Sequence, residues 1–529
     1  MAELSSSHQV LWADSRISIE NFHGIEIDDF AVEVAILSLW IAKHQMNREF
    51  REKFRVEIPL IPLKETGQIK PGNATRVDWN AVCPNDGKTE IYLIGNPPYI
   101  GSTLQTVEQK RDFSATFEDR PYSKLLDYIS LWFVKGANYI RQSRAQLAFV
   151  TTNSVSQGQH VEILFPMIFE KGIEIGFAYT SFKWQNNAKR NAGVTVAVIS
   201  LRPISPDPKY IYTDDLRISA TNINGYLADA ADIIAHKRTK PLSDALPPMV
   251  FGSKPTDGGY LLLSPVERTA LLDSDPTAER FIKTFLGAAD YIRGEDRYCI
   301  WVDGDTAEQA AQNPEIARRF EAVRAERRAS KKAATQALAN APFRFAETRY
   351  KPTESIIVPS ISSGRREYIP MGYLGPDTVI SNKGFAVYDA SPWVFAVLTS
   401  KMHMAWTSAV SGRMREDYQY SNTIVYNNFA VPPLPAGMKE ELTVAALRVL
   451  DVREYHCEQT LAELYDPAKM PQDLRDAHAA VDRLVDSIYS KKPYETDEQR
   501  LSDLFALYER MTAEEAAKVP AKKTRRSAT

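Results

Sequence analysis

The sequence predicts an α/β domain in its first 205 residues, followed by a mixed α/β domain and then a helical region. Two patterns support the first part. Short, wholly apolar runs alternate with segments whose apolar residues recur at helical spacing, and turn residues separate the two kinds. Strands that are apolar on both faces, with helices between them, are typical of a mostly parallel sheet covered on both sides.

The elements of the first 205 residues follow one another in order along the chain. Each uninterrupted apolar run is assigned to a strand, and each segment with apolar residues every three or four positions is assigned to a helix. The predicted strands are 22–27, 90–95, 146–153, 173–180 and 192–201, and the predicted helices are 28–47 and 124–140.

The remainder of the chain divides into four further parts. Residues 206–245 are a mixed connector, and residues 246–435 form a separate mixed domain with short strand-like runs such as 355–361. Residues 436–513 carry long helical periods and predict a helical domain. The end of the chain, 514–529, is basic and predicts a disordered tail.

Bulk composition limits the classes of protein that fit. A chain of 529 residues is longer than one hydrophobic core serves. The net charge of −3 means that any contact with nucleic acid must come from local basic patches. The three cysteines are far apart, which argues against a disulfide framework and against a zinc site and fits a cytoplasmic protein. The apolar runs are too short to span a membrane.

The most informative motif is Asn96-Pro97-Pro98-Tyr99, which directly follows the apolar run 90–95. Ligand sites of open α/β sheets lie beyond the carboxyl ends of strands. Proline offers a carbonyl without an N–H, Asn96 adds a side-chain carbonyl, and Tyr99 adds a flat ring. Such a pocket fits a planar molecule with an amino group, such as an adenine flipped out of a duplex. A merely rigid turn is the alternative.

The motif and its setting resemble the [DNS]-P-P-[YFW] signature of DNA amino-methyltransferases, whose Asn-first form is typical of the adenine-N6 class. From about residue 20 to 512 the chain also resembles the modification half of type IIL (MmeI-like) restriction–modification enzymes. This resemblance implies a Rossmann-like class I methyltransferase sheet, a target-recognition domain at 246–435, S-adenosyl-L-methionine as cofactor and double-stranded DNA as partner. The stretches that carry it are 24–47, 61–84, 181–201, 400–429 and 481–511.

The resemblance also implies roles for individual residues. It places Asn96, Pro97, Pro98 and Tyr99 in the catalytic motif. Cofactor-binding positions would be Glu26 with Ile27 at the ribose, Asp78 with Trp79 at the adenine, and Asn96. Stacking on the flipped base would fall to Tyr99, Phe182 and Trp184.

Simpler structural roles compete with some of these assignments. Glu26 could instead be a helix-start carboxylate near the helix dipole, although Asp28 or Asp29 fits that role better. Asp78 could cap the next helical turn. Asp127 could line the cofactor side or be a structural acid inside a helix.

Arginines in the predicted recognition domain are candidates for DNA contacts. Arg365, Arg366, Arg413 and Arg415 lie among tyrosines and polar residues and could grip phosphates or read guanine edges. Surface salt bridges are the alternative for each of them. The run 317–336 holds seven basic and two acidic residues between Arg318 and Lys332, and predicts either a phosphate-contacting helix or a merely solvated one.

One part of the family pattern is missing. The family opens its methyltransferase domain with a strand and the glycine loop D-P-A-C-G-S-G-N-F, and residues 1–20 contain no glycine. No nuclease motif precedes the methyltransferase either. We therefore expect a fold truncated at its N-terminus, a partner polypeptide that supplies the loop or a nuclease, and weak cofactor binding by the chain alone.

The leading hypothesis is a site-specific DNA adenine-N6 methyltransferase of a restriction–modification or phage-defence system, without a metal. Three alternatives stay open. The chain could be a catalytically silent DNA-recognition module that needs a partner. It could modify RNA or a protein glutamine, because the same motif serves those substrates, or it could transfer to cytosine N4.

Overall fold

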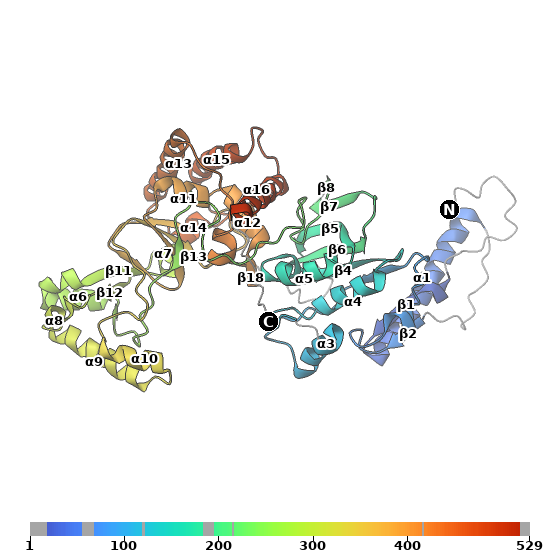
Figure 1. The fold of residues 1–529 in the computed structure, drawn as a ribbon, viewed down its shortest axis with the longest axis horizontal. Coiled ribbons are helices and arrows are strands. Elements are labelled where there is room, and N and C mark those ends of the chain that lie inside the picture. The colour runs from blue at the N-terminus through green and yellow to red at the C-terminus, as the bar shows by residue number, and fades with distance from the viewer. Residues whose placement is uncertain are drawn as a thin grey trace, which may run out of the picture. The chain divides into compact units, whose positions relative to one another are not determined.

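The computed structural model divides the chain into two compact units (Figure 1). Unit 1 comprises Met1–Val155, Ile163–Thr180 and Val196–Leu216, and unit 2 comprises Ser156–Glu162, Ser181–Thr195 and Arg217–Thr529. The residues whose structure is described are 18–55, 68–118, 122–183, 195–213, 216–414 and 417–518.

A six-stranded sheet with strand order β3-β4-β6-β5-β7-β8 lies mostly in unit 1, and only the end of β5, the first residue of β6 and β8 beyond Leu216 are assigned to unit 2. The predicted strands 90–95, 146–153, 173–180 and 192–201 are all present in it, with small shifts at their ends. The bounds are β3 Tyr92–Gly95, β4 Gln146–Thr152, β5 Ile173–Lys183, β6 Thr195–Pro203, β7 Lys209–Thr213 and β8 Leu216–Ala220.

Strand direction departs from the mostly parallel expectation at β6. β3 runs parallel to β4, and β5 runs parallel to β7, but β6 runs antiparallel to β4. Only residues 184–194 link β5 to its neighbour β6. A parallel crossover uses a dozen or more residues, so a link this short favours reversal.

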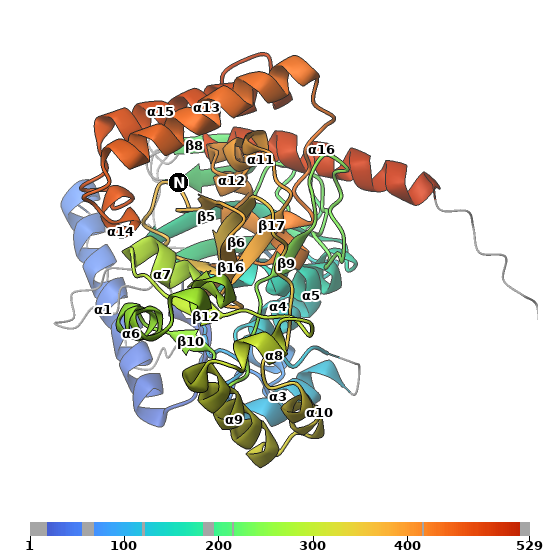
Figure 2. The same cartoon turned by 90° about the vertical axis from the view of Figure 1, so that its left-hand side faces the viewer.

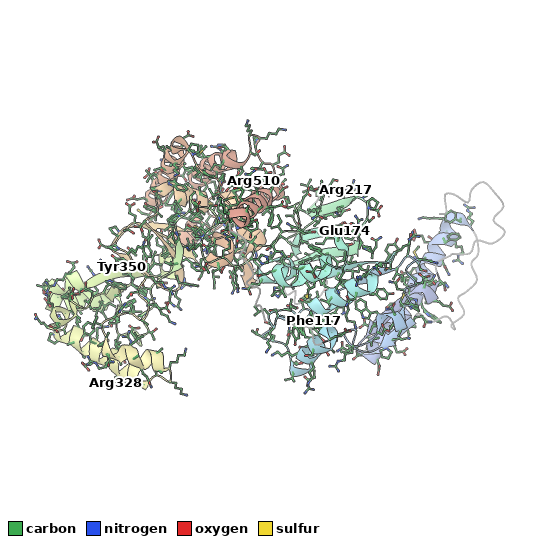
Figure 3. The ribbon with its side chains drawn as sticks, in the orientation of Figure 1. Phe117, Glu174, Arg217, Arg328, Tyr350 and Arg510 are labelled. Carbon is green, nitrogen blue, oxygen red and sulfur yellow. The ribbon has the colours of Figure 1, made fainter. Side chains whose placement is uncertain are left out.

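A buried ion-pair cluster joins three strands of this sheet. Glu174 of β5, labelled in Figure 3, accepts a hydrogen bond from Arg202 Nε of β6 at 2.9 Å and pairs with Lys209 Nζ of β7 at 3.0 Å. The predicted connector 206–245 is wrong in its first part, because β7 and β8 belong to the sheet. The segment "KYIYT" is rich in aromatic and β-branched residues, which favour a strand.

A separate two-stranded parallel sheet, β1-β2, completes the strands of unit 1. α1 connects the two strands and packs against both. Asp28 caps α1 by accepting from the N–H groups of Phe30 at 2.8 Å and Ala31 at 3.1 Å. The bounds are η2 Ile19–Asn21, β1 His23–Glu26, α1 Asp29–Phe54 and β2 Gln68–Pro71.

The helix predicted at 124–140 begins later than expected. α4 starts at Ser130, because the preceding residues bond to the loop after β3: Tyr128 N–H donates to the Ile100 carbonyl at 3.1 Å. Tertiary hydrogen bonds thus replace the first helical turns. The remaining helices around this sheet are α2 Trp79–Val82, α3 Val107–Phe117, α4 Ser130–Ile140, η3 Asn153–Ser156 and α5 Gln159–Phe169.

Unit 2 contains three small sheets, with strand orders β10-β12-β11-β16, β15-β13-β17-β9 and β14-β19-β18. The first sheet shares a core with α6, α8 and α9, which includes Phe281, Ile300, Phe320 and Val379. The strands of the three sheets are β9 Met249–Phe251, β10 Leu262–Leu263, β11 Ile282–Leu286, β12 Tyr298–Ile300, β13 Ser355–Pro359, β14 Ile361–Ser362, β15 Gly372–Leu374, β16 Thr378–Ile380, β17 Gly384–Tyr388, β18 Gly412–Met414 and β19 Asp417–Gln419.

The helices of unit 2 fall into an early and a late group. The early ones are α6 Pro265–Ser274, η4 Pro276–Phe281, α7 Ala288–Arg293, α8 Ala307–Ala310, α9 Pro314–Ala329, α10 Ala333–Ala337 and η5 Leu338–Asn340. The late ones are α11 Pro392–Leu398, α12 Lys401–Val410, η6 Asn422–Tyr426, α13 Ala436–Tyr455, α14 Leu461–Leu464, α15 Gln472–Tyr489 and α16 Asp497–Lys518.

The predicted C-terminal helices do not form a separate compact unit. α13 packs against α11 and α15, and α16 packs against α12, so they share unit 2 with the sheets (Figure 2). α16 also runs to Lys518, which corrects the predicted tail of 514–529 in its first residues. "AEEAAK" consists of strong helix formers. Among the described residues, no helix is long and apolar enough to cross a membrane.

Candidate functional site

A cavity of about 1270 Å³ lies in unit 1. Pockets for one small ligand usually measure roughly 300–1,000 Å³, so this space exceeds the usual range. Two strands border it along their whole length: residues 21–27 around β1 and residues 89–98 around β3. Further walls come from the α2 region, α3 and α4, including Asn73, Arg76, Trp79, Val82, Asp112, Tyr128 and Trp132.

Asn96, Pro97 and Pro98 line this cavity directly beyond the carboxyl end of β3. Asn96 and Pro98 are exposed, whereas Pro97 is buried. The prolines contribute carbonyls without N–H groups, so hydrogen-bond acceptors predominate at this rim. The position agrees with the rule that sites of α/β sheets lie beyond carboxyl strand ends.

The loop after the motif is anchored by hydrogen bonds from the segment before α4. Asp127 Oδ1 accepts from Ile100 N–H at 2.9 Å and from Ile129 N–H at 3.1 Å. Gln105 Nε2 donates to the Ile100 and Leu126 carbonyls, each at 3.0 Å. Asp127 is buried and is not among the residues that line the cavity, so the structure supports its structural role.

Glu26 and Ile27 lie at the carboxyl end of β1 and border the same cavity as Asn96. Both side chains are exposed and line the cavity. The helix-start role at this position is taken by Asp28, which caps α1. Glu26 therefore presents a carboxylate to the cavity without serving as the cap.

Asp78 and Trp79 differ in their surroundings. Asp78 caps α2, with Oδ1 accepting from Asn80 N–H at 3.0 Å, and it is not among the cavity-lining residues. Trp79 does line the cavity, and its indole N–H donates to the Ala74 carbonyl at 2.9 Å. Lys135 steadies the same loop by donating to the carbonyls of Thr75 and Val77.

A buried carboxylate that the sequence did not reveal, Asp112, also borders the cavity. The Asp112 carboxylate accepts from Arg76 Nε at 2.6 Å, from Tyr128 OH at 2.6 Å and from Asn73 Nδ2 at 3.2 Å. Burial opposes ionisation of Asp112, but these hydrogen bonds outweigh it and the pKa of Asp112 lies below its usual value.

The structure describes two of the three aromatic residues that we expect to stack on a base. Tyr99 is half-buried and is not among the cavity-lining residues. Phe182 lies near the end of β5 and is half-buried. Trp184 lies outside the described residues.

The candidate DNA-contacting arginines of unit 2 have different environments. Arg365 is exposed, and Arg366 is half-buried with its pKa lowered by burial. Arg413 stacks on the Tyr418 ring at 3.6 Å and donates to Ser408 Oγ at 3.1 Å. Arg415 lies outside the described residues.

The basic run 317–336 is not a uniform basic face. Arg319 is buried and bonds to Glu315, Glu267 and two carbonyls, while Arg327 is fully buried among carbonyls. Arg328, Lys331 and Lys332 are exposed (Figure 3 labels Arg328). Within the described part of the chain, no group of three His, Cys, Asp or Glu side chains is placed to hold a metal ion.

Comparison with protein families matches three domain descriptions in succession. "MmeI, DNA-methyltransferase domain" matches residues 2–213, "MmeI, target recognition domain" matches 229–433, and "MmeI, C-terminal domain" matches 435–515. The solved structure of the type IIL restriction–modification enzyme MmeI in complex with DNA is 34% identical, with a TM-score of 0.72, and the similarity covers 96% of this chain and 69% of that one. The chain belongs to the MmeI family.

A curated relative is DNA methyltransferase A of Bacillus subtilis (strain 168). It is 44% identical over 500 residues, which are 94% of this chain and 56% of that protein. This MmeI-family chain thus spans little more than half the length of its curated relative.

The three MmeI domain matches show which domain contains the cavity, the candidate arginines and the C-terminal helices. Every residue lining the cavity falls in the match to the methyltransferase domain, 2–213. Arg365, Arg366 and Arg413 fall in the match to the target recognition domain, 229–433. The match to the MmeI C-terminal domain, 435–515, contains α13 to α15 and most of α16.

Proposed function

We propose that this MmeI-family chain forms the larger part of a site-specific DNA methyltransferase that transfers a methyl group from S-adenosyl-L-methionine to the N6 amine of a flipped adenine. One observation supports this above all. Asn96 and Pro97, at the carboxyl end of β3, border the same cavity as the exposed Glu26 at the end of β1. Hydrogen-bond acceptors for the target amine and a carboxylate for the ribose hydroxyls therefore border the same cavity.

The motif residues would act on the target amine through hydrogen bonds. The Asn96 side-chain carbonyl and the Pro97 backbone carbonyl accept from the two N–H bonds of the amine. As the amine nitrogen attacks the methyl carbon, positive charge develops on the nitrogen until it loses a proton, and fixed acceptors stabilise that charge. Tyr99, with Phe182 or Trp184, would stack on the extruded base and offset part of the cost of flipping, a few kcal/mol.

The cavity residues fit the cofactor in their chemistry. The Glu26 carboxylate would accept from adjacent ribose hydroxyls, as acidic residues do at such strand ends. Ile27 and Trp79 offer apolar and aromatic surface for an adenine ring, and Asp78 lies next to Trp79 at the start of α2. When bound, S-adenosyl-L-methionine supplies the methyl group on its sulfonium sulfur.

DNA would be held by the part that matches the target recognition domain. Arg365 and Arg366 are candidates for base or phosphate contacts, together with Arg413 and Arg415. Exposed Arg328, Lys331 and Lys332 are candidates for phosphate contacts, which would make binding salt-sensitive. The enzyme would serve a restriction–modification or phage-defence system in the cytoplasm.

A second candidate is a catalytically silent DNA-recognition subunit. One observation favours it: β1 and β3, which carry Glu26 and Asn96, are not joined in one sheet. The spacing between these two strands then depends on side-chain packing rather than on strand pairing between them.

Methyl transfer by the chain tests the proposal. The chain is tethered to the part of DNA methyltransferase A that lies outside the matched region, given DNA and S-adenosyl-L-methionine, and the DNA nucleosides are analysed by mass spectrometry. We expect N6-methyladenine, with RNA and protein substrates unmodified. Asn96→Ala should lower the rate about 100-fold or more, as loss of a charge-stabilising group does. The matched control, Asn85→Ala, changes an asparagine that does not line the cavity.

The outcomes separate the candidates. N4-methylcytosine would replace the adenine assignment with the cytosine one. Sequence-specific binding of DNA without any methyl incorporation would favour the silent recognition subunit. Full activity of the Asn96 variant would remove that residue from the site.

A further inference from the structure

One buried carboxylate connects three segments of the chain around the cavity. Asp112, on α3, is only 2% exposed. Its Oδ1 accepts from Arg76 Nε at 2.6 Å, and its Oδ2 accepts from Asn73 Nδ2 at 3.2 Å and from Tyr128 OH at 2.6 Å. Asn73 and Arg76 lie on the turn before α2, whereas Tyr128 lies before α4. The turn, α3 and the segment before α4 therefore meet at Asp112.

On the first side, Asn73 organises the turn that leads to Trp79. Its side-chain carbonyl accepts from Thr75 N–H at 2.9 Å and from Thr75 Oγ1 at 2.7 Å. Its backbone carbonyl accepts from the N–H groups of Arg76 and Val77. Asn73, Arg76 and Trp79 all line the cavity. A shift of Asn73 would therefore move the wall at which the adenine of the cofactor would lie under the proposed function.

On the second side, Tyr128 holds the motif loop through its backbone. Its N–H donates to the Ile100 carbonyl at 3.1 Å, and the neighbouring Asp127 accepts from Ile100 N–H at 2.9 Å. One segment thus binds both backbone groups of the residue that follows Tyr99. Because the Tyr128 hydroxyl donates to buried Asp112, movement of this segment would break a buried hydrogen bond.

The protonation states of Asp112 and Tyr128 favour the bond between them. Burial opposes ionisation of Asp112, but the hydrogen bonds from Tyr128, Arg76 and Asn73 outweigh it, and the pKa of Asp112 lies below its usual value. Burial and the bond to Asp112 raise the pKa of Tyr128. Near neutral pH the carboxylate is therefore an acceptor and the phenol is a donor.

Stability alone does not require a carboxylate at this position. A charge taken out of water is costly unless it is paired and hydrogen-bonded, and apolar residues of similar size often replace buried ion pairs without loss of stability. α3 already packs against α4 (Figure 1), and the Phe113 ring of α3 lies 6.2 Å from the Tyr128 ring. What Asp112 adds to this packing is a set of directed bonds between segments.

We propose that Asp112 is a positioning residue that couples the cofactor side of the cavity to the motif at residues 96–99. The connection runs from Asn73 through the carboxylate to Tyr128 and then to the Ile100 backbone. A ligand that orders one end of such a connection favours the arrangement that binds at the other end, and the effect is reciprocal. The cofactor and the target DNA therefore bind cooperatively, and loss of the connection removes the cooperativity.

The inference deepens the proposed function and rests on it for the identity of the two ligands. The connection itself is a property of the chain without ligands. It can therefore be tested first by measuring the exchange of backbone amides, and then by measuring binding, without any methyl transfer.

Hydrogen–deuterium exchange of the full chain tests the connection. Tyr128→Phe removes the hydroxyl but keeps the ring and its contact with Trp132, at 5.3 Å between centroids, so the variant should fold. We expect exchange to quicken about 5-fold or more, as for loss of a buried hydrogen bond, at Arg76 and Val77 as well as at Ile100. A hydroxyl with a local role would loosen one of these segments only.

Tyr139→Phe is the matched control. Tyr139 also lines the cavity, contacts a tryptophan ring and donates its hydroxyl to a carbonyl, that of Cys83, at 2.7 Å. Both variants therefore lose the same chemical group from the wall of the same cavity. We expect Tyr139→Phe to quicken exchange near Cys83 and to leave exchange at Ile100 unchanged.

Equilibrium dialysis of the full chain then measures the cooperativity. The probe is radiolabelled S-adenosyl-L-homocysteine, which lacks the methyl group, so no transfer disturbs the equilibrium. Its Kd is measured with and without an excess of genomic DNA, which is long enough to contain every short recognition sequence. We expect DNA to lower the Kd for the native chain about 5-fold or more, within the usual range of coupling between two sites.

The variants separate coupling from simple damage to the cofactor site. Tyr128→Phe and Asp112→Leu should bring the ratio of the two Kd values to within about 2-fold of unity, because the connection is broken. Asp112→Asn should retain an intermediate ratio, because its one amide oxygen still accepts from Tyr128 or from Arg76. A residue with a merely structural role would raise both Kd values alike and leave their ratio unchanged.

Three results would overturn the inference. They are faster exchange on one side of Asp112 only in Tyr128→Phe, a native ratio in Tyr128→Phe and Asp112→Leu, and a native chain whose Kd does not respond to DNA. Failure of the proposed function is distinguishable from these. Formation of N6-methyladenine without cooperativity would keep the proposed function and remove the inference, whereas cooperative binding without methyl transfer would do the reverse.

Discussion

The Asp127 carboxylate accepts the backbone N–H of Ile100 at 2.9 Å and thereby holds the loop that leaves Asn96-Pro97-Pro98-Tyr99. The same oxygen accepts from Ile129 N–H at 3.1 Å, so one buried acid ties the motif to the start of α4. Precise placement of catalytic acceptors depends on such supporting bonds.

We predict that Asp127→Ala lowers the free energy of unfolding by about 2 kcal/mol or more, because buried N–H groups without acceptors cost about 1–3 kcal/mol each. In the tethered enzyme the variant should lower kcat more than it raises KM for DNA, since the acceptors become misplaced. Asp127→Asn keeps an acceptor oxygen and should retain most of the stability and most of kcat. Urea unfolding and steady-state methylation measure the two effects, and an unaltered kcat for Asp127→Ala would show that the loop is positioned otherwise.

Glu26 and Asp28 provide a matched pair of carboxylates two residues apart. Glu26→Ala should weaken cofactor binding by the tethered enzyme about 10-fold or more, because hydrogen bonds to a charged group contribute about 1.5–3 kcal/mol. Its effect on stability should be small, because Glu26 is exposed. Asp28→Ala should cost about 1 kcal/mol of stability through loss of the α1 cap and leave the cofactor Kd unchanged. Calorimetry and urea unfolding check both, and equal Kd values for the two variants would contradict the role of Glu26.

Asp482 predicts a pH dependence of stability. Its buried carboxylate accepts from Tyr368 OH at 2.6 Å and from Lys401 N–H at 2.7 Å, yet burial raises its pKa to about 6. The pKa in the folded chain exceeds the unfolded value near 4. The contribution of Asp482 to the stability of the fold is therefore fully present below about pH 4 and is lost as pH rises through 6.

Asp482→Asn cannot ionise and should escape this loss. Relative to the variant, the free energy of unfolding of the native chain should fall by up to about 3 kcal/mol between about pH 4 and pH 7.5, since one pKa unit corresponds to about 1.4 kcal/mol. Urea unfolding at both pH values measures the difference. A difference between the two proteins that stays constant with pH would show that Asp482 titrates normally.

Two adjacent arginines should separate stability from DNA affinity. Arg327 is fully buried and donates to the carbonyls of Pro255, Thr256, Leu338, Ala341 and Arg344. Arg327→Ala should lower the free energy of unfolding by about 3 kcal/mol or more, because it orphans these acceptors and leaves a cavity. Arg328→Ala changes an exposed side chain and should alter stability by less than about 0.5 kcal/mol.

For DNA affinity we expect the larger effect from Arg328 instead. Arg328→Ala should weaken binding similarly at all sequences and reduce the salt slope of log K by about 1 if Arg328 contacts a phosphate. Fluorescence anisotropy over a range of salt concentrations measures this. An unchanged slope would assign Arg328 to the solvated face of α9.

Local patterns allowed much of unit 1 to be predicted. The apolar runs at 90–95 and 146–153 became β3 and β4, because their assignment depends only on side-chain spacing. Other features escaped prediction because distant groups decide them. The early turns expected for α4 are replaced by bonds to Ile100, and the buried carboxylate of Asp112 is held by Arg76, which is distant in sequence. The roles of Glu26, Asn96 and the aromatic residues stay predictions.

The sequence by itself determined the order of the elements, the motif at the end of β3 and the membership of the MmeI family, because spacing and short motifs are local properties of the chain. Only the tertiary structure decided which arginines are buried, that the C-terminal helices share a unit with the recognition sheets, and that β1 and β3 border one cavity. Burial and strand pairing depend on groups far apart in sequence, whose meeting no local pattern encodes.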